Sequence, residues 1–124
     1  MARVTIEFYR EADGVVPFLD WFASLPGKAQ NKCRTRLERL EEMGHELRRP
    51  EADYLRDGIY ELRIKYQRLN YRILYFFHGQ DIIVLSQELR KERAVPPNEI
   101  DLAVDRKARY VSDPEVYGPA EELP

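Results

Sequence analysis

Apolar and polar side chains alternate along several short stretches of the chain, which is the pattern of half-buried β-strands. The stretches with this pattern are residues 4–8, 59–66 and 71–77, and a further apolar run begins at residues 82–85. Short segments of turn character, 67–70 and 78–81, separate the last three stretches. Because short turns join antiparallel neighbours, we expect one N-terminal strand and, later in the chain, an antiparallel β-meander.

Apolar side chains spaced three and four positions apart predict helices elsewhere. The expected helices are residues 15–25, residues 28–47 and a C-terminal helix that Pro96-Pro97-Asn98 opens and that reaches Val111. Asn98 is the expected N-cap, since its side chain can accept a hydrogen bond from the first turn. We therefore expect an α+β fold made of an N-terminal strand, two helices, an antiparallel β-meander and a C-terminal helix.

The length of 124 residues fits a single domain. We assign this domain to residues 1–111. Residues 112–124 contain three prolines and four acidic residues, which predicts a flexible acidic tail.

The composition excludes several classes of protein. Hydrophobic residues make up 44% of the chain, too many for a disordered protein. The longest apolar run, 73–77, is far shorter than the roughly 20 residues that a membrane span needs. The single cysteine, Cys33, excludes an internal disulfide and a cysteine-rich zinc site. No apolar signal segment follows Met1, and we expect a soluble protein of the cytoplasm.

Charge is distributed unevenly along the chain. The formal net charge is −2, which by itself argues against a nucleic-acid-binding protein. Residues 54–93 nevertheless carry eight basic and five acidic side chains, and they also hold the strongest strand pattern. A local positive field can bind phosphate even when the whole chain is slightly acidic, although an ordinary solvated sheet face has the same composition.

No phosphate-binding glycine loop and no pair of metal ligands stands out in the sequence. His45 and His78 are isolated, and Glu61 and Glu88 form no recognisable acid pair. What remains is a set of basic side chains interleaved with tyrosines: Arg63, Lys65, Arg72, Arg90, Lys91 and Arg93 with Tyr60, Tyr66, Tyr71 and Tyr75. Arginine binds phosphate bidentately and tyrosine offers a stacking surface for bases. Whether these side chains share one face depends on the strand register.

Several features recur in a recognisable order. They are Leu55 and Gly58 before Tyr60-Glu61-Leu62-Arg63, then Tyr71-Arg72 with Tyr75-Phe76-Phe77, a basic cluster after the third meander strand, and Pro96 with Glu99-Ile100 and Ala103. In this order and spacing the chain resembles the HigB-like branch of the RelE/ParE toxin superfamily, found in phages and in bacterial toxin–antitoxin pairs. The upstream stretch VVPFLDWFASLP fits as well, and the resemblance covers roughly residues 4–111.

The resemblance implies a RelE-like fold and a toxin that cuts mRNA, usually on the ribosome, without a metal or other cofactor. The ribose 2′-OH attacks the adjacent phosphate, and clustered cations stabilise the developing charge. By position, the resemblance implies catalytic roles for Arg63, Arg72, Lys91 and Arg93, and RNA contacts from Lys65, Arg68, Tyr71 and Arg90. It also implies a protein antitoxin, of the HigA-like helix-turn-helix type, that covers the basic groove.

The sequence departs from the family pattern at the end of the third meander strand. Many relatives carry a histidine where Gln87 stands and a glycine where Glu88 stands. A glutamine cannot exchange a proton, and an added carboxylate opposes phosphate binding. Two other interpretations therefore stay open. One is a catalytically inactive module that binds RNA or the antitoxin and serves as a corepressor, and the other is a ParE-like gyrase inhibitor.

Overall fold

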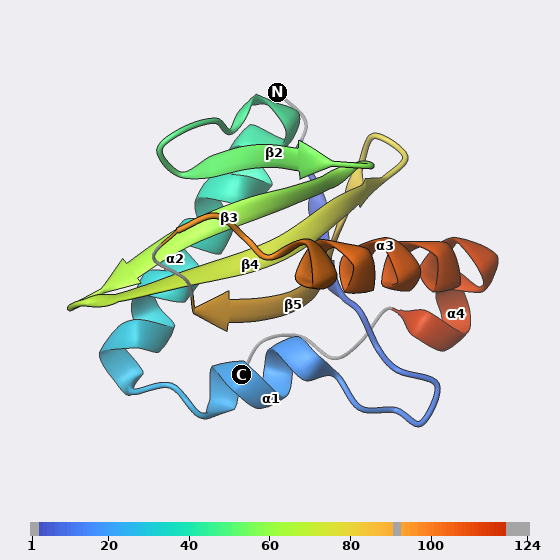
Figure 1. Cartoon of the computed structure of the whole chain (residues 1–124), viewed down its shortest axis with the longest axis horizontal. Coiled ribbons are helices and arrows are strands. Elements are labelled where there is room, and N and C mark those ends of the chain that lie inside the picture. Colours follow the sequence, from blue (N-terminus) through green and yellow to red (C-terminus); the bar gives the residue numbers. More distant parts are fainter. Residues whose placement is uncertain (1–2, 91–92, 119–124) are drawn as a thin grey trace.

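The computed structural model of the chain describes residues 3–90 and 93–118. In chain order its elements are β1 (Thr5–Phe8), α1 (Pro17–Ala23), α2 (Gly27–Met43), one 3-10 turn (Gly44–Glu46), β2 (Ala52–Arg56), β3 (Ile59–Tyr66), β4 (Leu69–His78), β5 (Ile82–Arg90), α3 (Pro97–Ser112) and α4 (Pro114–Tyr117). Figure 1 shows these elements as one twisted sheet with helices around it. The α+β class predicted from the sequence is confirmed.

The five strands form one sheet in the order β1-β5-β4-β3-β2. β3, β4 and β5 pair antiparallel in sequence order, so the expected meander is confirmed. β1 pairs parallel to β5, which makes the sheet mixed. Parallel strands cannot be joined by a tight turn, and α1, α2 and the strands β2, β3 and β4 lie in the chain between these two.

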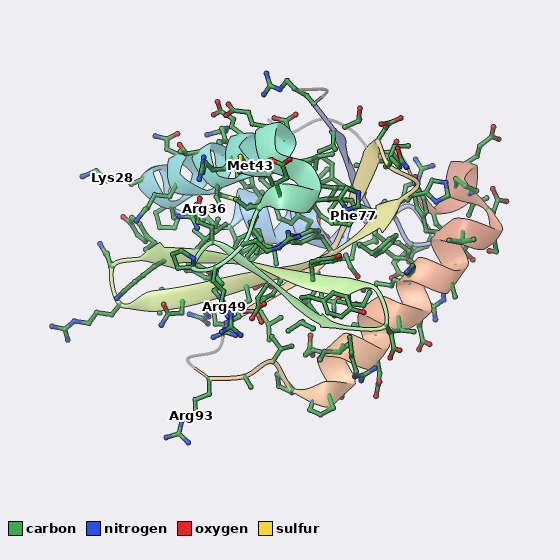
Figure 2. All side chains as sticks on the ribbon, turned by 90° about the horizontal axis from the view of Figure 1, so that it is seen from above. Lys28, Arg36, Met43, Arg49, Phe77 and Arg93 are labelled. Atoms are coloured by element: carbon green, nitrogen blue, oxygen red, sulfur yellow. The ribbon has the colours of Figure 1, made fainter. Side chains whose placement is uncertain are left out.

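Both faces of the sheet are covered, and each face has its own apolar core. Figure 2 shows α2 on one side of the sheet and α3 on the other. On the α1 and α2 side the buried residues include Phe18, Leu37 and Leu62. On the α3 side they include Leu74 and Phe76. Burial on both sides explains the nearly continuous apolar run of β4.

The structure corrects the sequence-based expectation at two points and extends it at a third. The sequence pattern does not predict β2, because its five residues show no clean alternation. Asn98 does not cap α3. The N-cap is Pro96, and the helix begins at Pro97, whose missing N–H is not needed at that position. β5 continues past Leu85 to Arg90. Its pairing register with β4 shifts between Leu74 and Tyr75, which pair with Gln87 and Leu85.

The expected flexible tail from residue 112 holds the end of α3 and the short helix α4. The Arg10 Nε donates to the carbonyl of Val116 at 3.1 Å. The Tyr117 ring stacks on Tyr9, with 5.9 Å between the centroids. This part of the tail therefore packs against the start of the chain, while residues 119–124 lie outside the described residues. The division of the chain after residue 111 stays a prediction. No helix in the described part of the chain is long and apolar enough to cross a membrane.

Candidate functional site

The register of β3 and β4 determines which basic side chains share a face of the sheet. Arg63 lies directly opposite Arg72, and Lys65 lies opposite Asn70. Side chains two positions apart on a strand point to the same face, so Lys65 joins the two arginines. Ile59, in the same alternating row, belongs to the apolar core on the α3 side. The structure therefore brings three of the predicted site residues together on that side of the sheet.

A buried carboxylate, Glu61, joins the two arginines. Its side chain is 3% exposed. Its Oε1 accepts a hydrogen bond from Nε of Arg63 and another from Nη1 of Arg72, each at 2.8 Å. Loss of one partner from a buried ion pair is strongly destabilising, so this arrangement holds both guanidinium groups in place. The two arginines that the sequence offers as strand cations are thus ion-paired within the fold.

Four carboxylates among the described residues are each shared by two arginines. One is Glu11, with Arg106 and Arg109 of α3. The other three, Glu61 among them, are held by arginines of α2, of the loop after α2, and of β3 and β4. The pairs are Arg36 and Arg39 on Glu51, Arg49 and Arg63 on Asp53, and Arg63 and Arg72 on Glu61. The closest nitrogen–oxygen distance is 2.9 Å at Glu51, 2.7 Å at Asp53 and 2.8 Å at Glu61. We call this set the arginine network. Its five arginines share three carboxylates, which leaves a surplus of two positive charges.

Part of the arginine network lines a hollow of about 330 Å³. The walls of the hollow come from Arg36 of α2, residues 50–51 of the loop after α2, and the paired stretches 63–65 and 70–72 of β3 and β4. Side-chain exposure is 29% for Arg36, 34% for Arg63 and 13% for Arg72, so a ligand can reach these groups. The exposed Lys65 adds a further positive charge to the wall. A hollow lined in this way suits an anion.

Two carboxylates of the network are held in their charged form. Hydrogen bonds from the Arg39 guanidinium lower the pKa of the Glu51 carboxyl, and those from Arg49 lower the pKa of Asp53. Both groups are therefore ionised at neutral pH. Glu51 is the one carboxylate among the described residues that line the hollow. Within the described parts of the chain, no three histidine, cysteine, aspartate or glutamate side chains come together where they could hold a metal ion.

Three of the predicted RNA contacts, on β4, on β5 and in the turn between β3 and β4, differ in the sheet face that they occupy and in their exposure. Arg90 is opposite Tyr71 in the register of β4 and β5, and these two share the sheet face that carries α1. Tyr71 lines the hollow, but it is 7% exposed and its ring packs against Trp21, with 5.4 Å between the centroids. Arg68 is exposed in the turn between β3 and β4. Arg90 therefore lies on the opposite face from the arginine pair.

The basic cluster after β5 is described only in part. Lys91 lies outside the described residues. Arg93 is exposed, and Figure 2 shows it pointing away from the sheet on the same side as Arg49. Arg93 is not among the residues that line the hollow.

Gln87, where the resemblance leads us to expect a histidine, is enclosed between β5 and the start of α3. It is 5% exposed. Its Nε2 donates to the backbone carbonyl of Glu99 at 2.8 Å. Its Oε1 accepts from the Arg106 guanidinium at 3.4 Å and from the Ser86 hydroxyl. The amide thus ties β5 to α3 and does not line the hollow.

Glu88 faces the other side of the sheet. It is opposite Ile73 in the register of β4 and β5, and Ile73 belongs to the core on the α1 and α2 side. Burial raises the pKa of the Glu88 carboxyl, and the nearby Arg90 opposes this effect. The added carboxylate is therefore on the opposite face from the arginine pair.

Sequence reasoning missed five members of the network: Arg36, Arg39, Arg49, Glu51 and Asp53. The α2 pair fits the polar outer face of an amphipathic helix. The other three lie between residues 48 and 53, where two adjacent arginines closely precede two acidic residues. That local charge pattern was the available signal. Its meaning depends on the pairing of β2 with β3, which sets Asp53 opposite Glu61.

One family model matches the chain over most of its length. Its description is Phage derived protein Gp49-like (DUF891), and the match spans residues 20–108. Every residue of the arginine network and of the hollow falls within this range. The comparison with curated proteins found no match.

Proposed function

The chain belongs to the Gp49-like phage-derived family, a RelE/toxin-like family, and we propose that it is a HigB-like toxin of a type II toxin–antitoxin pair. In this proposal it cleaves mRNA on the ribosome without a metal ion. The observation that carries the proposal is the surplus of positive charge in the arginine network, where five arginines share three carboxylates and part of which lines the hollow. Such a local surplus attracts the RNA backbone, although the chain as a whole is slightly acidic.

The hollow offers groups that RNA transesterification needs. In that reaction the ribose 2′-oxygen attacks the adjacent phosphorus and the bond to the 5′-oxygen breaks. The products are a 2′,3′-cyclic phosphate and a 5′-hydroxyl. In our proposal, Arg63 and Arg72 stabilise the charge that builds up on the phosphate oxygens. The 2′-OH donates a hydrogen bond to the ionised Glu51 and releases its proton to solvent water, and Lys65 donates a proton to the leaving 5′-oxygen.

Charge reversal at Lys65 tests the proposal without disturbing the ion pairs. Lys65 is exposed, and it takes part in none of the ion pairs found among the described residues, so Lys65→Glu should change stability little. Lys28→Glu is the matched control. Lys28 is exposed in the first turn of α2, where Figure 2 shows it pointing into solvent, and it does not line the hollow.

The proteins are expressed from an inducible promoter in a heterologous bacterial host, and growth and the 5′ ends of cellular mRNA are recorded. We expect growth arrest with codon-phased cuts from the wild type and from Lys28→Glu. We expect normal growth without cuts from Lys65→Glu, with the protein present at a similar level. Full activity of Lys65→Glu would contradict the proposal. Arrest of the wild type without new mRNA ends would also contradict it, and would indicate a protein target such as gyrase.

The partner that we propose is an antitoxin of the HigA-like helix-turn-helix type that covers the hollow. The surplus of positive charge supports this partner, because carboxylates of an acidic antitoxin segment can occupy the place of RNA phosphates. In this arrangement the pair also represses its own operon. Binding of the antitoxin and binding of RNA should therefore exclude each other.

A second candidate function is that of a binding module without catalysis, which holds RNA or the antitoxin and serves as a corepressor. Gln87 favours this candidate, because the position where many relatives carry histidine holds a buried amide that is bonded to α3. Such an amide cannot exchange a proton. In the expression experiment this candidate predicts normal growth of the wild type, with RNA or antitoxin still bound by the purified protein.

A further inference from the structure

Arg63 and Arg72 face each other directly across β3 and β4. Like charges in this position repel and destabilise a sheet, so two unpartnered guanidinium groups would turn apart into water. Glu61 opposes this separation. Two hydrogen bonds, each 2.8 Å long, end on its Oε1, one from each arginine. The two guanidinium groups therefore converge on one point beside the hollow.

We infer that Glu61 is a positioning residue, which holds Arg63 and Arg72 side by side so that together they form one binding site for a single RNA phosphate. This inference rests on the proposed function, because it concerns the substrate of the same hollow. A guanidinium group has five N–H donors, and Glu61 engages one nitrogen of each arginine. Donors on both arginines therefore remain for a phosphate. Glu61 is 3% exposed, so it acts through the arginines and not on the RNA.

The charge of Glu61 and its positioning role have opposite effects on RNA affinity. If only the charge acted, its removal would make the hollow more positive, and RNA would bind more tightly. If Glu61 positions the arginines, its removal lets them separate, and RNA binds more weakly although the net charge has become more positive. The direction of the change in affinity therefore distinguishes the two roles.

The test measures binding of a short single-stranded RNA with 2′-O-methyl riboses, which cannot be cleaved, by fluorescence anisotropy over a range of salt concentrations. Glu61→Gln keeps the shape and removes the charge, whereas Glu61→Asp keeps the charge and withdraws the carboxylate by one methylene group. Asp105→Asn, at an exposed position of α3, is the matched charge control. Circular dichroism confirms that each variant is folded at the temperature of the assay.

We expect about tenfold weaker binding for both Glu61 variants, because two arginine side chains must then be ordered during binding. Asp105→Asn should change the affinity by at most about twofold, since its charge is screened by salt. The slope of log affinity against log salt is negative, and its magnitude should decrease by about 0.7 in Glu61→Gln, the value for one phosphate contact on a single strand. A merely structural role would reduce the fraction of active protein and leave that slope unchanged.

Equal or tighter binding by folded Glu61→Gln overturns the inference, and so does wild-type affinity of Glu61→Asp. If Glu61→Gln does not fold, Glu61→Asp still decides, because it leaves the charge unchanged. A wild type that does not bind the RNA at all would refute the proposed function, and the inference with it. That result differs from a wild type that binds while the Glu61 variants bind equally well.

Discussion

Removal of the Arg72 guanidinium should destabilise the fold in addition to any effect on RNA. The side chains of Arg72 and Glu61 are 13% and 3% exposed, so Arg72→Leu takes one partner from a carboxylate that stays buried. Breaking a buried pair from one side costs about 3–5 kcal/mol. Because Arg63 still binds Glu61 at 2.8 Å, we expect the lower end of this range, about 3 kcal/mol of unfolding free energy.

The double variant Glu61→Leu/Arg72→Leu removes both charges. Its new side chains would meet apolar neighbours, since Glu61 is opposite Leu74 and Arg72 is opposite Leu89. Arg63 keeps Asp53 at 3.5 Å. Replacement of a buried ion pair by apolar side chains is often neutral or stabilising, so we expect the double variant to lie within about 1 kcal/mol of the wild type.

Urea unfolding followed by fluorescence measures both free energies. The chain has a single tryptophan, Trp21, whose ring packs against Tyr71 of β4, so its emission reports the packing of α1 on the sheet. The reasoning is refuted if Arg72→Leu lies within about 0.5 kcal/mol of the wild type, the range of ordinary surface substitutions. It is also refuted if the double variant is no more stable than the single one.

Three further substitutions test other parts of the account. Gln87→Leu removes the bond to the Glu99 carbonyl, and we expect a loss of about 1–2 kcal/mol in the same urea experiment, where an unchanged midpoint would contradict us. Burial raises the pKa of Glu88 above its unfolded value, so its ionisation lowers stability as the pH rises. Glu88→Gln should therefore raise the Tm at about pH 7 and lose this gain at about pH 4, and equal Tm values at the higher pH would count against the argument. Gly58 has a φ of +80°, so Gly58→Ala should lower the free energy of unfolding by about 1–2 kcal/mol. The control Gly27→Ala in α2 should not lower it. Equal effects of the two substitutions in thermal unfolding would show that backbone strain is not the cause.

The elements predicted best from the sequence are those whose signal is local. The alternation over residues 59–66 coincides with β3, and the three- and four-residue spacing locates α2 and α3 to within a few residues. β2 lacked such a signal. It is a five-residue edge strand that exists because it pairs with β3, and nothing in its own sequence shows that partner. Likewise, the parallel pairing of β1 with β5 joins segments far apart in the chain, which periodicity cannot reveal.

In the candidate site, too, the sequence predicted what has a local signal and missed what depends on contacts between distant segments. The sequence predicted Arg63, Lys65 and Arg72 as basic side chains on neighbouring strands and left open whether they share a face, and the register shows that they do. It did not show that Glu61, two residues before Arg63, would be buried between the two arginines. That burial depends on which elements pack against this face of the sheet. The contribution of Arg36 depends in turn on how α2 docks, since its Nη1 donates to the backbone carbonyl of Arg63 at 2.6 Å.

The most direct test of the central claim is a titration of ¹⁵N-labelled protein with the non-cleavable single-stranded RNA, followed by backbone amide and arginine side-chain resonances. We predict that the largest changes fall on residues 63–65 and 70–72 and on the Arg36 side chain, which line the hollow. The resonances of α4 and of the end of α3 should stay unchanged. Changes centred on another face of the molecule, or no change in the presence of excess RNA, would contradict the account.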